Sequence, residues 1–190
     1  MTYDDGLFLD ATNLARETSW LNSASLDYSA FGVVLFGLLI VAAWWQARSA
    51  GVVAVSRVAA VPAAAVAAFL ADLSVKLVVE EARPCYAFPH AFILETCPVS
   101  TDYSFPSNHT AVAVAMAASL LMVNRRLGIL SVLLAVVMGV SRVYNGAHYP
   151  HDVLAAAAIG IVAAWVAMRW VPGLVAPIIE RVREMTPTRR

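Results

Sequence analysis

The chain has 190 residues, of which 61% are hydrophobic and 14% are charged, and its formal net charge is zero. A mean hydropathy of +0.72 indicates an integral membrane protein, and the neutral charge balance argues against a nucleic-acid partner. Because each helical crossing needs about 20 apolar residues, this length leaves room for five or six helices and for no separate soluble domain.

Residues 1–27 mix apolar and charged side chains. Leu7 and Leu14 are interspersed with Asp10 and Arg16, so this segment contains no continuous apolar run that could cross a bilayer. We expect an amphipathic helix that lies in the membrane interface. A soluble tail is the alternative.

Five apolar runs follow, and each predicts a membrane-spanning helix. They cover residues 30–45, 52–70, 111–123, 127–140 and 153–171. We expect the second helix to continue through Lys76 toward Arg83 until Pro84 stops it, and the third to begin at Ser107 or Asn108, which are good N-cap residues. The predicted fold class is therefore all-α: a single-domain, polytopic bundle of five transmembrane helices plus the N-terminal interfacial helix.

Basic residues predict the orientation of this bundle. If all five runs span the membrane, nine arginines lie on one side, which the positive-inside rule makes cytoplasmic. They are Arg48, Arg57, Arg125, Arg126, Arg169, Arg181, Arg183, Arg189 and Arg190. Residues 178–190 then form a cytoplasmic tail, and residues 84–106 form an extracytoplasmic loop that is long enough to suggest a function.

The chain contains two cysteines, Cys85 and Cys97, and both fall in this loop. An oxidising compartment would permit a disulfide between them. Two separate thiols are the alternative.

A polar cluster separates the last two apolar runs. Arg142, His148 and Asp152 stand in a segment where ionisable side chains at membrane depth usually mark function. A carboxylate four residues after a histidine can hold the proton on Nδ1 and leave Nε2 free to attack. With Arg142 to hold an anion, the cluster predicts a phosphate site.

Two further segments should meet this cluster on the same membrane face. Lys76 and Arg83 are two helical turns apart and so point the same way, and Ser107, Asn108 and His109 open the third helix. Snorkelling cations or a simple helix cap would explain either segment alone. Together they are hard to explain as packing.

These residues resemble the signature of the type 2 phosphatidic acid phosphatase superfamily. Its three motifs correspond to Lys76 with Arg83-Pro84, to Pro106-Ser107-Asn108-His109, and to Ser141-Arg142 with His148 and Asp152. All three spacings match. One residue departs, because Asn108 replaces the usual glycine, and we expect the anion-binding amides to survive this change since Asn tolerates unusual φ values.

The resemblance implies a metal-independent phosphatase without a cofactor. His148 would be the nucleophile that forms a phosphohistidine, Asp152 would fix its tautomer, and His109 would be the general acid. The phosphate would be bound by Lys76, Arg83, Ser107, Asn108 and Arg142.

Among such enzymes, the chain looks most similar to bacterial undecaprenyl-diphosphate phosphatases of the bacitracin-resistance type. That likeness implies a membrane lipid phosphate as the substrate, a role in peptidoglycan synthesis and a place in the cell membrane with the active site facing outward. A phosphatidylglycerophosphate or phosphatidate phosphatase is the alternative within this class. A noncatalytic lipid-binding or transport protein is the alternative from another class.

Overall fold

The computed structural model describes residues 3–185, which form helices and loops and contain no strand. The helices are α1 (Tyr3–Glu17), the short 3₁₀ turn η1 (Ser19–Leu21), α2 (Asn22–Phe31), α3 (Val33–Ala47), α4 (Val52–Val79), α5 (Pro84–Ala87), α6 (Asn108–Val123), α7 (Arg125–Tyr144) and α8 (Pro150–Met185). The all-helical class expected from the sequence is confirmed.

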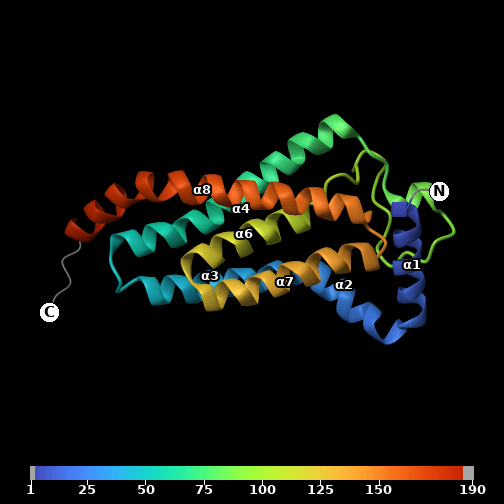
Figure 1. Ribbon diagram of the computed structural model, residues 1–190, viewed down its shortest axis with the longest axis horizontal. Coiled ribbons are helices and arrows are strands. Elements are labelled where there is room, and N and C mark those ends of the chain that lie inside the picture. Colours follow the sequence, from blue (N-terminus) through green and yellow to red (C-terminus); the bar gives the residue numbers. More distant parts are fainter. Residues whose placement is uncertain (1–2, 186–190) are drawn as a thin grey trace.

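Helices α3, α4, α6, α7 and α8 run along the long axis of the molecule, and α1 crosses one end (Figure 1). Helix α6 is central and packs against α4, α7 and α8, while α4 also packs along α8. Small side chains line these contacts, since Ala111 and Ala115 of α6 and Ala156 and Ala164 of α8 are fully buried. Such residues let helix backbones approach closely, as they do in membrane bundles.

The described helices include three that are long and apolar enough to cross a membrane. These are Val52–Ala87, α7 and α8, and the pair α2–α3, bent by 53°, would make a fourth. Helix α6 has only 16 residues, about 24 Å of length, which is less than the roughly 30 Å of a hydrocarbon core. The chain therefore has three or four candidate spans by length, fewer than the five that the apolar runs predict.

Local signals end the helices where the polar segments begin. Glu80 caps α4 in the left-handed conformation (φ 52°), and Pro84 then starts α5. Gly146, with φ of 76°, turns the chain between α7 and α8. These loops and the start of α6 all lie at the end of the bundle that α1 crosses (Figure 1).

The N-terminal segment is packed against this end and forms two helices where one was expected. Phe8 of α1 is fully buried, with its ring centroid 5.6 Å from that of Phe88 and 5.5 Å from that of Tyr149. Thr18 and Tyr144 share a hydrogen bond of 2.7 Å. These contacts anchor α1 to the loops of the bundle.

The first part of the expected cytoplasmic tail, residues 178–190, continues the last helix. Helix α8 continues without a break to Met185, even though it contains Pro172 and Pro177. Residues 186–190, with Arg189 and Arg190, lie outside the described part of the chain, as do residues 1–2 of the N-terminal segment.

Gly160 marks the closest approach of α8 to α6 and supports a prediction about stability. A Cβ at this position would lie 2.6 Å from the main-chain oxygen of Ala111 and 2.9 Å from the nitrogen of Ala115. We expect Gly160→Ala to lower the free energy of unfolding by about 1–3 kcal/mol, seen as a lower Tm in detergent.

Gly173 on the same helix is the matched control, because a Cβ there would have no neighbour within 4 Å. Gly173→Ala should leave Tm unchanged or raise it, since alanine favours helix more than glycine does. An equal Tm for the two variants would contradict the close approach of α6 and α8.

Candidate active site

The first cationic pair comes from the end of α4 and the turn after it. Lys76 and Arg83 are buried, and both contact residues of the loop between α5 and α6 (residues 88–107, the α5–α6 loop). Lys76 Nζ donates to the main-chain oxygen of Tyr103 at 2.8 Å and lies 3.8 Å from Asp102 Oδ1. Arg83 donates from Nε to the main-chain oxygen of Asp102 at 2.9 Å, and its Nη2 lies 3.0 Å from Oδ1. One carboxylate therefore faces both cations.

Arg142, near the end of α7, is the third cation and is 3% exposed. Its Nη1 and Nη2 lie 2.7 Å and 2.9 Å from the two carboxylate oxygens of Glu95, and Nη1 also donates to the hydroxyl of Ser29. Its Nε is buried and has no hydrogen-bond partner among residues 3–185. The guanidinium is thus held by Glu95 on one edge and keeps one donor unused.

A buried histidine and carboxylate lie beside these cations. His148 is 1% exposed and Asp152 is fully buried, and His148 Nδ1 lies 3.2 Å from Asp152 Oδ2. The same oxygen accepts hydrogen bonds from the Ser104 hydroxyl at 2.5 Å and from the amide of Tyr149 at 2.9 Å. On the other side of the ring, His148 Nε2 lies 3.5 Å from Arg83 Nη1. Asp152 therefore orients the imidazole with Nε2 toward the cations.

Burial lowers the pKa of His148 to about 4, because an imidazolium inside the protein would lose its hydration. The positive charges of Arg142 and Arg83 act in the same direction, while the hydrogen bond to Asp152 opposes it. His148 is consequently neutral at physiological pH. Its Nε2 then carries a lone pair, as a nucleophile requires.

The start of α6 brings Ser107, Asn108 and His109 to the same end of the bundle. Ser107 is the N-cap residue, as predicted, and its amide donates to the main-chain oxygen of Asp152 at 3.4 Å. His109 lines a polar cavity of about 430 Å³ together with Arg142 and Glu95. It also lines a smaller apolar cavity of about 190 Å³ formed with Asn108 and with α3, α4 and α7. His109 therefore stands between a space lined by charged residues of both signs, Arg142 with Glu95 and Asp27, and an apolar one.

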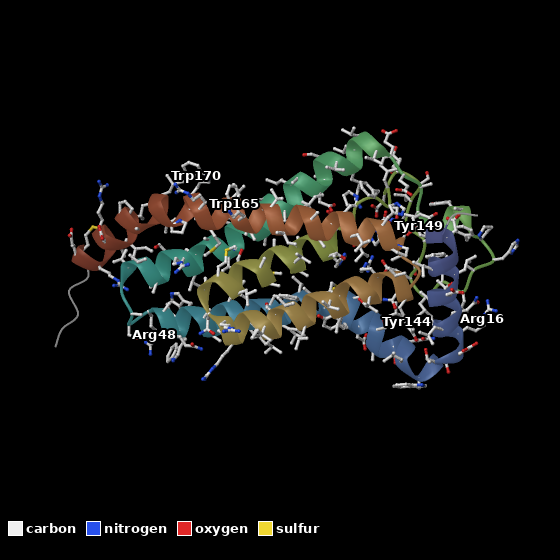
Figure 2. The ribbon with its side chains drawn as sticks, viewed as in Figure 1. Arg16, Arg48, Tyr144, Tyr149, Trp165 and Trp170 are labelled. Atoms are coloured by element: carbon white, nitrogen blue, oxygen red, sulfur yellow. A yellow bond between two sulfur atoms is a disulfide. The ribbon has the colours of Figure 1, made fainter. Side chains whose placement is uncertain are left out.

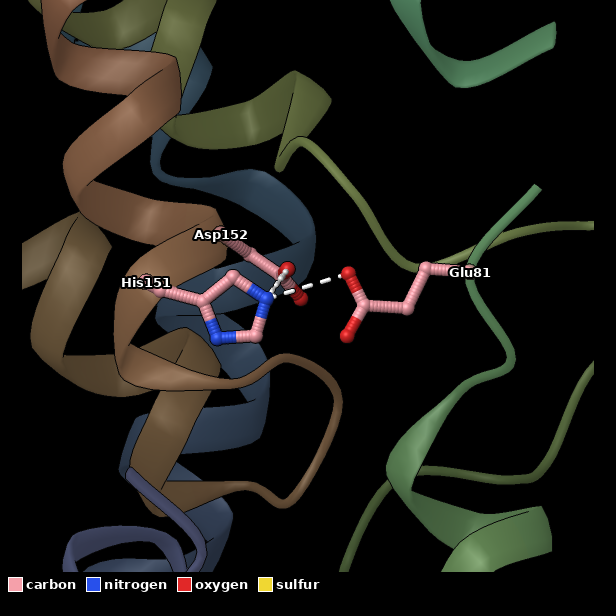
Figure 3. A group of neighbouring side chains, drawn as sticks. All are labelled: Glu81, His151 and Asp152. Carbon is pink, nitrogen blue, oxygen red and sulfur yellow. Dashed lines mark hydrogen bonds and ion pairs between the residues drawn. The ribbon is translucent and has the colours of Figure 1, made fainter. Parts of the chain in front are cut away.

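His151 joins three carboxylates beside this site. Its Nδ1 lies 2.6 Å from Asp4 Oδ2, and its Nε2 lies 3.0 Å from Glu81 Oε2 and 3.2 Å from Asp152 Oδ1 (Figure 3). Within residues 3–185, Glu81, His151 and Asp152 are the group whose ligand atoms, all within 4.8 Å of one another, could hold a metal ion. The imidazole already fills the space between the carboxylates and ties α1 and Glu81 to α8.

A disulfide joins Cys85 to Cys97, with their Cα atoms 5.9 Å apart. The amides of Leu94 and Glu95 both donate to the main-chain oxygen of Asn145, at 3.1 Å and 3.2 Å. The disulfide ties the first half of the α5–α6 loop to α5. The two hydrogen bonds fix it against the turn that follows α7.

The structure brings the residues that the motifs single out into one place. They are Lys76, Arg83, Ser107, Asn108, His109, Arg142, His148 and Asp152. Sequence reasoning missed Ser104, Glu95 and Asp102. The hydroxyl of Ser104 lies in a loop and follows no recognisable spacing. Glu95 and Asp102 are two acids in a loop next to predicted cations, and this could have been taken as a sign of charge pairing.

Comparisons with known proteins agree with this geometry. A sequence model of the PAP2 superfamily matches residues 57–176. Undecaprenyl-diphosphatase BcrC of Bacillus subtilis (strain 168) is 28% identical over 187 residues, which cover 96% of this chain and 90% of that protein. The undecaprenyl-diphosphatase of Sulfolobus acidocaldarius is 36% identical over 96 residues, 50% of this chain and 45% of that protein. The crystal structure of Aquifex aeolicus LpxE has a TM-score of 0.69 and 26% identity, and the match covers 90% of this chain and 100% of that chain.

The lowered pKa of His148 predicts how stability depends on pH. As pH falls from 6.5 toward 4, the unfolded chain takes up a proton at His148 while the folded chain does not. The free energy of unfolding should therefore fall by up to about 1.4 kcal/mol per pH unit in that window. Tm measured in detergent from pH 7.5 to 4.5 should drop more steeply for the wild type than for His148→Gln. Parallel curves would mean that His148 is not held neutral by burial.

Proposed function

The chain belongs to the PAP2 superfamily, and from that premise we propose that it is an integral membrane phosphatase that hydrolyses undecaprenyl diphosphate. The products are undecaprenyl monophosphate and inorganic phosphate, so the enzyme regenerates the lipid carrier of cell-wall synthesis. The observation that carries the proposal is the neutral His148, oriented by Asp152 and facing buried cations. The similarity to undecaprenyl-diphosphatases over nearly the whole chain supports the choice of substrate.

In the proposed mechanism, His148 Nε2 attacks the terminal phosphorus of the diphosphate. The bond from that phosphorus to the bridging oxygen breaks, and a phosphohistidine forms. Asp152 Oδ2 holds the proton on Nδ1 and stabilises the positive charge that develops on the ring. Lys76, Arg83 and Arg142 neutralise the phosphoryl oxygens.

His109 protonates the bridging oxygen as it leaves with the lipid monophosphate. The same side chain then activates the water that hydrolyses the phosphohistidine. Its position between the polar and apolar cavities suits a group that acts where phosphate and lipid meet. The start of α6 adds the Ser107 hydroxyl and the Asn108 amide as hydrogen-bond donors, together with the positive end of the helix dipole.

The proposed reaction needs no metal ion. Three buried cations supply the charge neutralisation that magnesium gives in many phosphoryl transfers. Glu81, His151 and Asp152 lie beside the site. Both ring nitrogens of His151 are already in contact with carboxylates, Nδ1 with Asp4 and Nε2 with Glu81.

In the membrane, we propose five spans, with α3 (extended by α2), α4, α6, α7 and α8 crossing and α1 lying in the interface. The short α6 begins at the active site, below the membrane surface. Arg48 lies toward the end of the bundle opposite Arg16, Tyr144 and Tyr149 (Figure 2). The positive-inside rule makes the Arg48 end cytoplasmic, and a disulfide suits an extracytoplasmic site in the cell membrane.

The first functional test uses purified protein in EDTA. We expect phosphate release from a polyprenyl diphosphate to exceed that from phosphatidylglycerophosphate and phosphatidate, with vanadate as an inhibitor. His148→Ala should lower turnover by roughly 10⁴-fold or more, the order seen for catalytic triads, and should lose the acid-quenched phosphohistidine.

His90→Ala is the matched control, because His90 is exposed in the α5–α6 loop. Comparable turnover of all three lipids would leave a broader lipid phosphatase. Lipid binding by wild-type protein without any turnover would instead support the noncatalytic alternative, and activity that required magnesium would contradict the proposed chemistry.

Sidedness can be tested with added cysteines at two exposed positions, Thr101 in the α5–α6 loop and Ser49 in the turn between α3 and α4. We expect an impermeant thiol reagent to label Thr101→Cys in intact cells and to label Ser49→Cys only after lysis. The native disulfide is retained in both variants. The reverse pattern would put the active site in the cytoplasm and would rule out recycling of an externally released carrier.

A further inference from the structure

All three site cations are paired with acids of one segment, the α5–α6 loop. Asp102 faces Lys76 and Arg83, with its Oδ1 3.8 Å from Nζ and 3.0 Å from Nη2. Glu95 spans both terminal nitrogens of Arg142, at 2.7 Å and 2.9 Å. These carboxylates thus contact the same cationic groups that would bind a phosphate.

We infer that Glu95 and Asp102 are specificity-determining residues, whose carboxylates act as exchangeable anions in the phosphate site. A group with at least two negative charges, such as a terminal phosphate, displaces them. A phosphodiester headgroup with one negative charge does not. This inference rests on the proposed phosphatase function and adds to it a means of rejecting the diester phospholipids of the surrounding membrane.

The physical reason lies in charge compensation. Lys76, Arg83 and Arg142 are 5%, 8% and 3% exposed, and cations so deeply buried are stable only when negative charge lies close. A phosphate monoester is largely a dianion at neutral pH, because its second pKa is about 6. Such a dianion replaces the two carboxylates charge for charge. A monoanion that displaced both would supply one negative charge fewer, so one more buried cation would lose its compensation.

The geometry allows this exchange by rotation of side chains alone. The side chains of Asp102 and Glu95 are 44% and 32% exposed, so water can receive both carboxylates. Their backbones stay anchored, since the main-chain oxygen of Asp102 accepts from Arg83 and the amide of Glu95 donates to Asn145.

A first contact for the phosphate is also present. Arg142 Nε is buried without a hydrogen-bond partner among the described residues. Arg142, Glu95, Asp27 and His109 line one cavity of about 430 Å³, which is large enough to admit a phosphate. A phosphate that enters this cavity therefore meets Arg142 beside the carboxylates of Glu95 and Asp27.

The test compares two soluble anions, inorganic phosphate and dimethyl phosphate, at low ionic strength. Their binding is measured as the rise in Tm that each produces and as competitive inhibition of lipid turnover. We expect Glu95→Gln and Asp102→Asn each to bind phosphate about fivefold more tightly than the wild type, because a competing carboxylate is gone. The affinity for dimethyl phosphate should rise by a larger factor than the affinity for phosphate. The ratio of phosphate affinity to dimethyl phosphate affinity should therefore fall.

Glu80→Gln is the matched control. Glu80 is exposed at the end of α4, and this substitution removes the same charge from the same end of the bundle. It should change neither affinity. If Glu95→Gln fails to fold, Glu95→Asp can be used in its place. This variant keeps the charge but shortens the side chain, and it should also bind phosphate more tightly than the wild type.

Unchanged or weaker phosphate binding in the loop variants would overturn the inference, because the carboxylates would then only position the cations. An unchanged ratio of the two affinities would overturn it as well. The Tm measurement needs no turnover, so a wild-type protein that shows the expected anion pattern but hydrolyses no lipid phosphate would contradict the proposed function alone.

Discussion

Burying Lys76, Arg83 and Arg142 at one end of an apolar bundle removes most of their hydration, and each cation then needs negative charge within a few ångströms. The arrangement of the whole polar end follows from this need. Asp102 and Glu95 meet it in the structure, and the positive charges of Arg83 and Arg142 help to keep His148 neutral. A single electrostatic constraint thus links anion binding, the protonation state of the nucleophile and the path of the loop.

The α5–α6 loop shows how irregular backbone can be held in a definite place without regular structure. After α5 it contains no helix or strand, yet the disulfide, the ion pairs and the hydrogen bonds to Asn145 fix it at several points. Ser104 holds the loop at a further point, because its amide donates to the main-chain oxygen of Glu81 while its hydroxyl donates to the carboxylate of Asp152. The loop is therefore part of the proposed active site and does more than connect two helices.

The sequence predicted much of this arrangement, because periodicity and helix-end signals are local. Ser107 caps α6 as expected, and the spacing of Lys76 and Arg83 places them on one side of a helix end. Contacts between distant segments were less accessible. Nothing near Asp102 or Glu95 in the chain indicates which cation each will face, since that depends on how the loop folds back over the bundle.

Helix boundaries failed where local rules were overridden. A bend at Gly32 separates α2 from α3 within the apolar run from Ala30 to Trp45, which was predicted as one helix. Pro172 and Pro177 do not end α8, which runs on to Met185. Prolines are tolerated within transmembrane helices when other groups satisfy the freed backbone, and the helix therefore extends beyond the apolar run 153–171.

The contact of Phe8 with Phe88 and Tyr149 has a consequence for biosynthesis. Helix α1 is translated before the aromatic residues that it packs against, and Tyr149 immediately precedes α8. Helix α1 therefore cannot reach its final position until translation has passed Tyr149. Because Tyr149 adjoins His148, a polypeptide interrupted before these residues would lack both an aromatic partner of α1 and the histidine that we propose as the nucleophile.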